Sequence, residues 1–411
     1  MKYIAVLGHG VVGSGVVEVL DKNRESIAKK AHDEIAVKYI LDVRDFPELP
    51  YADKFVKDFE VIVNDPEIEV VVETIGGITP AYDFVKAAML AGKSVATSNK
   101  ELVAKKGAEL LRIAKEKNVN FLFEASVGGG IPIIRPLNQC LAANEIDEIA
   151  GILNGTTNFI LTKMIKEQMT FEDALALAQK LGYAERDPSA DVEGEDACRK
   201  ICILAALCFG SHVYPDSVYT EGITKVTLQD VEYAEQAGCV IKLLGRAKRL
   251  EDGKLLIMVS PALVGKDSQL ANVDDVFNAI LVKGNAIGDV VFYGRGAGKL
   301  PTASAVVADV IDAVKHKNAR KYLFWEDAKE NYVVDYKETQ CAFYLRIQTN
   351  HAGDCLDKAD ILFGGVKKLE GKPGEVAFIT KPQEEKTVDA LIEQLEKTGD
   401  KLLSKIRMLD Y

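Results

Sequence analysis

The chain has 411 residues, of which 48% are hydrophobic and 27% are charged, and its formal net charge is −11. The length predicts two or three domains that each bury a core, and the composition argues against a disordered, collagen-like or coiled-coil protein. The acidic balance disfavours a broad nucleic-acid surface, and no apolar run approaches the roughly 18 residues of a membrane span, so we expect neither partner.

The first part of the chain alternates short β-rich runs with longer helical patterns. Strands are predicted at residues 3–7, 35–41, 61–63, 70–74, 94–97 and 120–124, and helices at 11–30, 80–91 and 100–117. Thr79 is predicted to be the N-cap of the second helix, with Pro80 as its first residue. Near-continuous apolar strands separated by helices indicate an α/β fold with a doubly wound parallel sheet over residues 1–125.

A second domain is predicted over residues 126–325, beginning in the glycine-rich stretch SVGGGIP. It mixes helices at 171–181, 195–209 and 230–247 with strands at 255–259, 279–282 and 289–292, which is typical of an α+β domain. A helix at 302–316 ends this region, and we expect the segment 302–320 to pack back on the first domain.

The final domain is predicted over residues 332–411. Its elements follow the order strand (341–348), helix (355–363), strands (365–370 and 375–380), helix (385–398) and strand (402–409). This βαββαβ order is that of a ferredoxin-like unit.

The seven cysteines include no CxxC pair, which favours reduced thiols in a cytoplasmic protein. Cys198, Cys202 and Cys208 fall in an apolar helical segment, where buried packing is favoured over metal binding. With five histidines, none of them near a cysteine pair, a zinc site is disfavoured.

The segment Gly8-His9-Gly10-Val11-Val12-Gly13 is a G-x-G-x-x-G that follows the first predicted strand and opens the first helix. In that context the glycines permit a tight turn and close backbone approach, and the helix N-terminus faces a pyrophosphate. The pattern favours a Rossmann-type dinucleotide site over a structural glycine turn. We predict cofactor contacts from Gly8, Gly10, Val11, Val12 and Gly13.

The cofactor's identity depends on the end of the second strand. Asp42 would accept a hydrogen bond from a ribose 2′-OH and favour NAD, whereas Arg44 would pair with a 2′-phosphate and favour NADP. Because Arg44 lies just past the strand end, NADP or dual use is preferred, although both residues could equally be solvated loop charges.

Asp196 and Lys200 lie four residues apart in a predicted helix and therefore on one face. Such a pair is most often a surface ion pair. The strongly apolar remainder of this helix suggests instead that it faces a cavity. A lysine whose pKa is lowered by burial can act as a general acid when an aldehyde is reduced, and as a base in the reverse direction.

Several sequence blocks resemble the homoserine dehydrogenase family in order and spacing, over about residues 3–315. They are GHGVVGSGV, TSNKELVA, EASVGGGIPII, GILNGTTNFIL with GYAERDPSADVEGEDACRK, and FYGRGAGKLPTASAVV. The resemblance implies reversible NAD(P)H-dependent reduction of L-aspartate 4-semialdehyde to L-homoserine, in threonine, methionine and isoleucine biosynthesis. A dehydrogenase of another amino or sugar acid, and a non-catalytic nucleotide and amino-acid sensor, remain alternatives.

By this resemblance the middle domain is catalytic and dimerising, Lys200 is the acid/base, Asp196 binds substrate, and Lys100 is a second active-site lysine. Lys100 lies at the end of a strand, where ligands of open α/β sheets bind. The resemblance also implies further cofactor contacts, from Ser98, Lys100, Gly182, Glu185, Gly296 and Gly298.

A free amino acid needs carboxylates to neutralise its ammonium group. Glu185 matches the family's substrate glutamate and Asp191 is a supporting acid, whereas the residues alone favour a polar loop around Asp187-Pro188. Ala190 departs from relatives that have an acidic residue there. The family also places the block that holds Asn154, Gly155 and Thr156 at the substrate pocket; the alternative is a helix cap by Thr157 or Asn158.

The resemblance further implies a monovalent cation, sodium or potassium. Its ligands would be the Glu124 carboxylate and the backbone carbonyls of Val127, Gly129 and Ile131, and oxygen-only ligation suits a hard cation. The alternative is a plain turn between two domains.

The final domain resembles an ACT-type regulatory domain. Its first loop, 349–354, lies where such domains place a ligand-binding glycine, but this chain has Asn350 in place of the usual acid and lacks the proline. Binding of an effector such as threonine and a purely dimerising role are both open. ACT domains commonly pair side by side, so we expect a homodimer or homotetramer.

Overall fold

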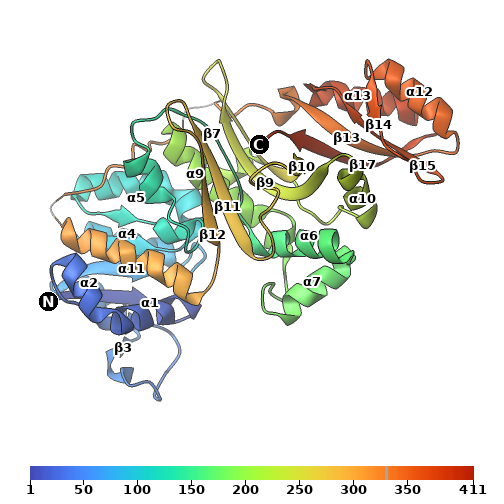
Figure 1. Cartoon of the computed structure of the whole chain (residues 1–411). Helices are drawn as coiled ribbons and strands as arrows, with labels where there is room; N and C mark the ends of the chain where they lie inside the picture. The colour runs from blue at the N-terminus through green and yellow to red at the C-terminus, as the bar shows by residue number, and fades with distance from the viewer. Residues whose placement is uncertain (318, 329–331) are drawn as a thin grey trace.

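A six-stranded parallel sheet is built by the first third of the chain (Figure 1). The computed structural model describes residues 1–317, 319–328 and 332–411. The strand order β3-β2-β1-β4-β5-β6 is that of a Rossmann fold, which confirms the predicted class. The strands are β1 (Lys2–Leu7), β2 (Ile35–Leu41), β3 (Phe55–Val56), β4 (Ile68–Glu73), β5 (Ser94–Thr97) and β6 (Phe121–Leu122).

Helices cover both faces of this sheet: α1 (Val11–Lys22), α2 (Arg24–Ala31), α3 (Glu60–Val63), α4 (Ala81–Leu90) and α5 (Lys100–Lys117). The predicted strand at 61–63 is wrong, because Asp58 accepts the Glu60 amide at 2.9 Å and starts the short helix α3. The helix predicted at 11–30 is divided at Asn23. The predicted Thr79 cap is also wrong, since Pro80 is the N-cap residue of α4 and makes no side-chain cap.

A second sheet has 11 strands in the order β12-β11-β7-β9-β10-β17-β13-β15-β14 with β8 and β16 paired to it off this path. Its middle-region strands are β7 (Ile146–Ile152), β8 (Tyr219–Thr220), β9 (Cys239–Arg249), β10 (Leu255–Gly265), β11 (Phe277–Gly284) and β12 (Gly288–Arg295). The helix predicted at 230–247 is wrong in its second half. Helix α10 (Leu228–Gln236) ends before Gly238, whose φ is +80°, and β9 then pairs with β7 and β10.

One face of the second sheet is covered by α6 (Gly155–Glu167) and α9 (Glu195–Phe209), with α7 (Phe171–Lys180) and α8 (Ser189–Val192) beside them. The sequence predicted α7 and α9 but assigned no element to β7 or α6. None of the helices in the described residues combines the length and hydropathy that crossing a bilayer requires.

Helix α11 (Lys299–Lys315) returns to the first sheet and packs beside α1, as Figure 1 shows. A Cβ on Gly15 would lie 2.9 Å from the Lys299 carbonyl oxygen, so glycine allows the two helices to approach closely. Ala303, Val306 and Val310 share a core with strand β1. The expected segment 302–320 also includes residue 318, which lies outside the described residues.

The C-terminal elements are β13 (Gln340–Gln348), α12 (Ala352–Leu362), β14 (Val366–Lys368), β15 (Glu375–Thr380), β16 (Gln383–Glu384), α13 (Glu385–Glu396) and β17 (Lys401–Leu409). The order β17-β13-β15-β14 confirms the predicted ferredoxin-like arrangement. Strand β17 also pairs in parallel with β10, matching Ala262 with Arg407, so this unit extends the second sheet.

Candidate active site

The glycine-rich turn after β1 leaves the N-terminus of α1 open. A Cβ on Gly13 would lie 1.9 Å from the Gly8 carbonyl oxygen, and Gly8 has a φ of +92°, so both positions require glycine. Gly10 is the N-cap residue, forms no side-chain cap and has open space around it. Val11 follows it and is exposed. The first amides of α1 can therefore receive an anionic group, which fits the pyrophosphate of a dinucleotide.

The end of β2 places Asp42 and Arg44 beside this turn. Asp42 accepts the His9 amide at 2.7 Å, and the Arg44 Nε and Nη2 donate to its two oxygens at 3.0 Å each. The Arg44 side-chain hydrogen bond holds the pKa of Asp42 well below its usual range, against the effect of burial. Lys57, which sequence reasoning missed, donates to the carbonyls of Val43 and Arg44 at 3.0 and 2.6 Å.

Lys200, Asp196 and Lys100 form a cluster where α9 of the second sheet meets α5 of the first. The Lys200 Nζ donates to Asp196 Oδ2 and to the Leu153 carbonyl oxygen, each at 2.7 Å. The Lys100 Nζ forms an ion pair with Asp196 Oδ1. Asp196 and Lys200 are 2% and 8% exposed, so the four-residue spacing marks a buried pair and not a surface pair.

The charges of this cluster shift one another's titration. Burial is the largest influence on Lys200 and lowers its pKa; the Asp196 carboxylate opposes this effect and the Lys100 ammonium adds to it. Burial alone would raise the pKa of Asp196, but the two lysine ammonium groups hold it well below its usual range. The cluster therefore places the Asp196 carboxylate between two lysines, and the buried Lys200 loses its proton more readily than an exposed lysine does.

Asn154 links this cluster to the start of α6. Its Oδ1 accepts the Thr157 amide at 2.8 Å, so Asn154 is the helix cap, and its Nδ2 donates to Asp191 at 2.7 Å and to Asp196 at 2.9 Å. Burial, and then the charge of Asp196, raise the pKa of Asp191. Thr156 Oγ1 donates to the Tyr183 carbonyl at 2.7 Å, which ties α6 to the loop that carries Gly182 and Glu185.

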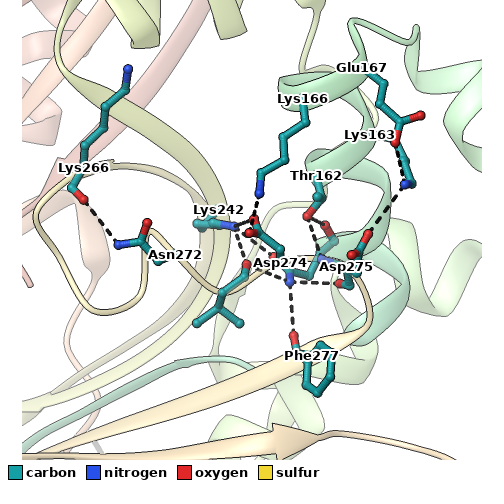
Figure 2. A network of polar contacts seen from close by, with 12 residues as sticks. Thr162, Lys163, Lys166, Glu167, Lys242, Lys266, Asn272, Asp274, Asp275 and Phe277 are labelled. Carbon is teal, nitrogen blue, oxygen red and sulfur yellow. Dashed lines mark hydrogen bonds and ion pairs between the residues drawn. The ribbon is translucent and has the colours of Figure 1, made fainter.

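The neighbouring Gly155 packs against a loop that a buried polar network holds in place. A Cβ on Gly155 would lie 2.9 Å from the Val276 carbonyl oxygen. Asn158 donates to the carbonyls of Val273, Asp275 and Phe277 at 3.0 to 3.1 Å. Figure 2 shows Lys242 entering the same network, where it donates to the Val273 carbonyl at 2.5 Å and burial lowers its pKa to about 8.

Three predicted residues form no hydrogen bond with the cluster within the described residues. Glu185 is exposed, and among the described residues its carboxylate has no hydrogen-bond partner, whereas its backbone oxygen accepts from Gln179 at 3.0 Å. Gly182 lies in the same exposed loop with a φ of +77°. Ser98, half-buried at the end of β5, directly precedes the Asn99 cap of α5.

The glycine-rich loops at residues 128–130 and 296–298, both in the predicted middle domain, contact each other through backbone atoms. A Cβ on Gly129 would lie 2.4 Å from the Gly296 carbonyl oxygen, and one on Gly296 would lie 2.0 Å from Asn278 Nδ2. Gly298 is the N-cap residue of α11, with a φ of +126° and no side-chain cap. The contact between Gly129 and Gly296 places the loop after β12 beside the turn that follows Glu124.

Glu124 is buried, and its carboxylate holds the turn that follows it. It accepts the amides of Ile133, Ile134 and Arg135 at 2.7, 2.9 and 2.9 Å. Within the described residues the carbonyl oxygens of Val127, Gly129 and Ile131 accept no hydrogen bond. No group of three or more His, Cys, Asp or Glu side chains suited to a metal occurs in the part of the chain that the structure describes.

Comparisons with known proteins agree with the predicted family and fold. Two family models match, described as homoserine dehydrogenase over residues 132–311 and as its NAD binding domain over residues 8–124. The homoserine dehydrogenase of Pseudomonas aeruginosa is 44% identical over 87% of this chain and 85% of its own length. The Helicobacter pylori enzyme is 37% identical over 96% and 95% of the two chains.

Solved structures agree as well. A homoserine dehydrogenase from Thiobacillus denitrificans has a TM-score of 0.92 at 39% identity, covering 100% of this chain and 98% of that chain. A hyperthermophilic archaeal homoserine dehydrogenase in complex with NADPH has a TM-score of 0.65 at 30% identity, covering 76% of this chain and 98% of that chain.

Proposed function

The chain belongs to the homoserine dehydrogenase family, and we propose that Lys200, Asp196 and Lys100 carry the reaction of that family. The enzyme interconverts L-aspartate 4-semialdehyde and L-homoserine with a nicotinamide cofactor. When bound, the nicotinamide supplies the hydride in reduction and accepts it in oxidation. The observation that supports these roles is the buried ion pair of Lys200 with Asp196. Lys100, on helix α5 of the cofactor-binding domain, forms a second ion pair with the same carboxylate.

Lys200 acts as the general acid and base. Its ammonium has three N–H groups, of which two donate to Leu153 and Asp196, so the third is free to face the substrate oxygen. In reduction this group gives its proton to the developing alkoxide. In oxidation the neutral amine takes the hydroxyl proton, and the lowered pKa makes this form accessible at a lower pH.

Asp196 orients both lysines and carries the negative charge that keeps two ammonium groups together. We assign the substrate's ammonium end to Asp191 and Glu185. Its carboxylate end is assigned to Asn154, Gly155 and Thr156, where the backbone amides at the start of α6 would donate, because the Asn154 and Thr156 side-chain donors already bind protein oxygens. The raised pKa of Asp191 supports this role, because a bound ammonium would stabilise its charged form. For Glu185 to take part, its exposed loop would have to move toward the cluster.

NADP is the favoured cofactor. Arg44 and Lys57 place two cations at the end of β2, where a 2′-phosphate would lie, and the turn residues Gly8, Gly10, Val11, Val12 and Gly13 would receive the pyrophosphate. The nicotinamide half would meet Ser98, Lys100, Gly182, Glu185, Gly296 and Gly298. Asp42 already accepts hydrogen bonds from Arg44 and the His9 amide, which makes it a poorer acceptor for a ribose hydroxyl.

A sodium or potassium ion is proposed at the turn after Glu124. The unpaired carbonyls of Val127, Gly129 and Ile131, with one lone pair of the Glu124 carboxylate, make an oxygen-only donor set that fits a hard monovalent cation. There the cation would stabilise the turn that packs against Gly296.

The C-terminal unit is proposed to be an ACT-like domain that binds an amino acid such as threonine, within a homodimer or homotetramer. Its ferredoxin-like strand order and its pairing with β10 of the catalytic region support a regulatory role. We retain residues 1–125, 126–325 and 332–411 as the proposed domains.

The test is oxidation of L-homoserine followed at 340 nm, with NADP and NAD compared at several pH values. Lys200→Ala is expected to abolish turnover while NADPH binding, measured by fluorescence, stays near the wild-type value. Arg199→Ala is the matched control, because this neighbour on the same helix forms an ion pair with the exposed Glu195, away from the cluster. Retained turnover in Lys200→Ala would refute the assignment of the acid/base.

A further inference from the structure

A buried carboxylate lies between the cofactor-binding turn and the helix that carries Lys100. It belongs to Glu73, the last residue of β4, which has no exposed surface. Burial is the largest influence on this group and raises its pKa, while hydrogen bonds from Thr97, Gly76, Ile75 and Asn99 oppose that effect. Within the described residues, no lysine, arginine or histidine forms an ion pair with it. Burying such a group without a counter-charge is costly unless its oxygens are hydrogen-bonded.

One oxygen of Glu73 shapes the loop that borders the cofactor-binding turn. Oε1 accepts the amides of Ile75 and Gly76 at 2.8 and 3.1 Å. A Cβ on Gly8 would lie 3.2 Å from Ile75 Cα, and Thr74 Oγ1 donates to the Gly8 carbonyl at 3.0 Å. Glu73 thus fixes the loop 74–77 against the first glycine of the turn.

The other oxygen of Glu73 leads to Lys100. Oε2 accepts the Thr97 hydroxyl at 2.5 Å, and the same hydroxyl oxygen accepts the Asn99 amide at 2.9 Å. Asn99 caps α5 by accepting the Leu102 amide at 3.0 Å, and Lys100 is the first residue of that helix. A continuous series of hydrogen bonds therefore joins the Glu73 carboxylate to the residue before Lys100.

The two branches meet again in Asn99, whose Nδ2 donates to the Gly77 carbonyl at 2.6 Å. The loop beside the cofactor-binding turn and the start of α5 are thereby held at one relative position. Lys100, the first residue of α5, forms its ion pair with Asp196 from this helix start.

We propose that Glu73 is a positioning residue for the dehydrogenase reaction, whose buried carboxylate aligns the loop 74–77 with the helix start that delivers Lys100 to Asp196. It touches neither substrate nor reacting atoms and acts through Thr97 and Asn99. The inference rests on the proposed role of Lys100. A group misplaced by about 1 Å can lower a rate by about 100-fold, so a positioning defect appears in kcat.

Glu73→Gln tests the hydrogen bonds of the two carboxylate oxygens separately. Its Oε1 can still accept the amides of Ile75 and Gly76, but its NH2 group cannot accept the Thr97 hydroxyl hydrogen. Thr97→Val breaks the same branch from the other side, and Thr97→Ser keeps the hydroxyl. If Glu73→Gln failed to fold, Thr97→Val would still test the branch to Lys100.

The experiment measures kcat, KM for L-homoserine and Kd for NADPH in the full-length enzyme. Glu73→Gln and Thr97→Val are each expected to lower kcat by about 10-fold, with Kd for NADPH within about twofold of wild type. Thr97→Ser, which keeps the hydroxyl, is expected to have the wild-type kcat. In a Lys100→Ala background, Glu73→Gln should lower kcat by less than about twofold, because residues that act as a unit are non-additive. A general structural role would lower kcat equally in both backgrounds.

Glu69→Gln is the matched control, since Glu69 lies on the same strand and pairs with Lys2 and Lys317 away from the loop. It should lower thermal stability without changing kcat. Wild-type kcat in both Glu73→Gln and Thr97→Val, or an undiminished effect in the Lys100→Ala background, would overturn the inference. A Lys100→Ala enzyme with wild-type kcat would refute the proposed role of Lys100 and, with it, this inference, whereas a wild-type chain inactive on homoserine would refute the function itself.

Discussion

Replacing Asp196 with Asn tests the electrostatics of the active site directly. The substitution keeps the shape of the side chain but removes the charge that lies 2.7 Å from Lys200 and also pairs with Lys100. Removing one partner of a buried ion pair typically costs about 3–5 kcal/mol, because the other charge stays buried without compensation. We expect the free energy of unfolding to fall by about that amount at low pH, and homoserine oxidation to be lost.

The pH dependence of the loss in unfolding free energy identifies Lys200 as the group whose charge is left unpaired. An unpaired, buried Lys200 binds its proton less tightly in the folded state than in the unfolded state, where its pKa is near 10.5. In the pH range where Lys200 is neutral in the folded variant but charged in the wild type, the stability deficit should shrink by about 1.4 kcal/mol per pH unit. Above the wild-type pKa of Lys200, both proteins follow the same slope and the deficit is constant.

The assay is urea unfolding at pH 6, 7, 8 and 9, followed by the fluorescence of Trp325, the chain's one tryptophan. The matched control is Glu195→Gln on the same helix, whose exposed carboxylate pairs with Arg199; this change should cost at most about 0.5 kcal/mol at every pH. A deficit in Asp196→Asn that stays equal from pH 6 to 9, or one no larger than the control's, would refute the reasoning.

Three further predictions concern the cofactor-binding turn and the C-terminal unit. Arg44→Ala should raise KM for NADP by about 10-fold and leave KM for NAD nearly unchanged, because one charge-assisted bond to the 2′-phosphate is lost; initial rates with both cofactors measure this. Gly13→Ala should lower the melting temperature, since its Cβ would lie 1.9 Å from a carbonyl oxygen of the turn, whereas Gly10→Ala, with no atom within 4 Å, should change only cofactor affinity. Glu385→Gln should destabilise the C-terminal unit by about 3 kcal/mol in urea unfolding, because it removes a carboxylate that holds the buried Arg407 guanidinium at 2.6 and 2.8 Å; equal midpoints would contradict this.

The features that could be predicted from sequence are those encoded over short distances. The strand, turn and helix around the glycines needed only 13 residues, and the ferredoxin-like unit was indicated by its order of elements. The spacing of Asp196 and Lys200 showed that they share a helix face, but burial of that face comes from β7, β9 and β10, which lie elsewhere in the chain. Strand β9 was misread as a helix because its apolar run fits both periods, and pairing on both edges decides between them.

The features that could not be predicted depend on contacts between distant segments. Nothing local marks Lys57, which reaches the end of β2 from 13 residues beyond Arg44. In the sequence Glu73 looks like an ordinary residue at the end of a strand, and the role proposed for it depends on its hydrogen bond with Thr97, 24 residues away. No sequence pattern predicts that β17 pairs with β10, since the sequence of each strand is equally compatible with a place at the edge of its own sheet.

The relative position of the hydride donor and Lys200 depends on how the two sheets are joined. Two contacts near this junction are between backbone atoms, Gly15 with Lys299 and Gly129 with Gly296. A third is the ion pair of Arg135 with the buried Asp309. Backbone contacts with no intervening side chain leave little room for adjustment, because protein interiors are close-packed. A methyl group at Gly129 would therefore have to push the loop after β12 away from the cofactor-binding sheet. Such a shift of the loop that carries Gly296 would change the distance between the bound cofactor and the Lys200 amine without replacing a side chain of the acid/base.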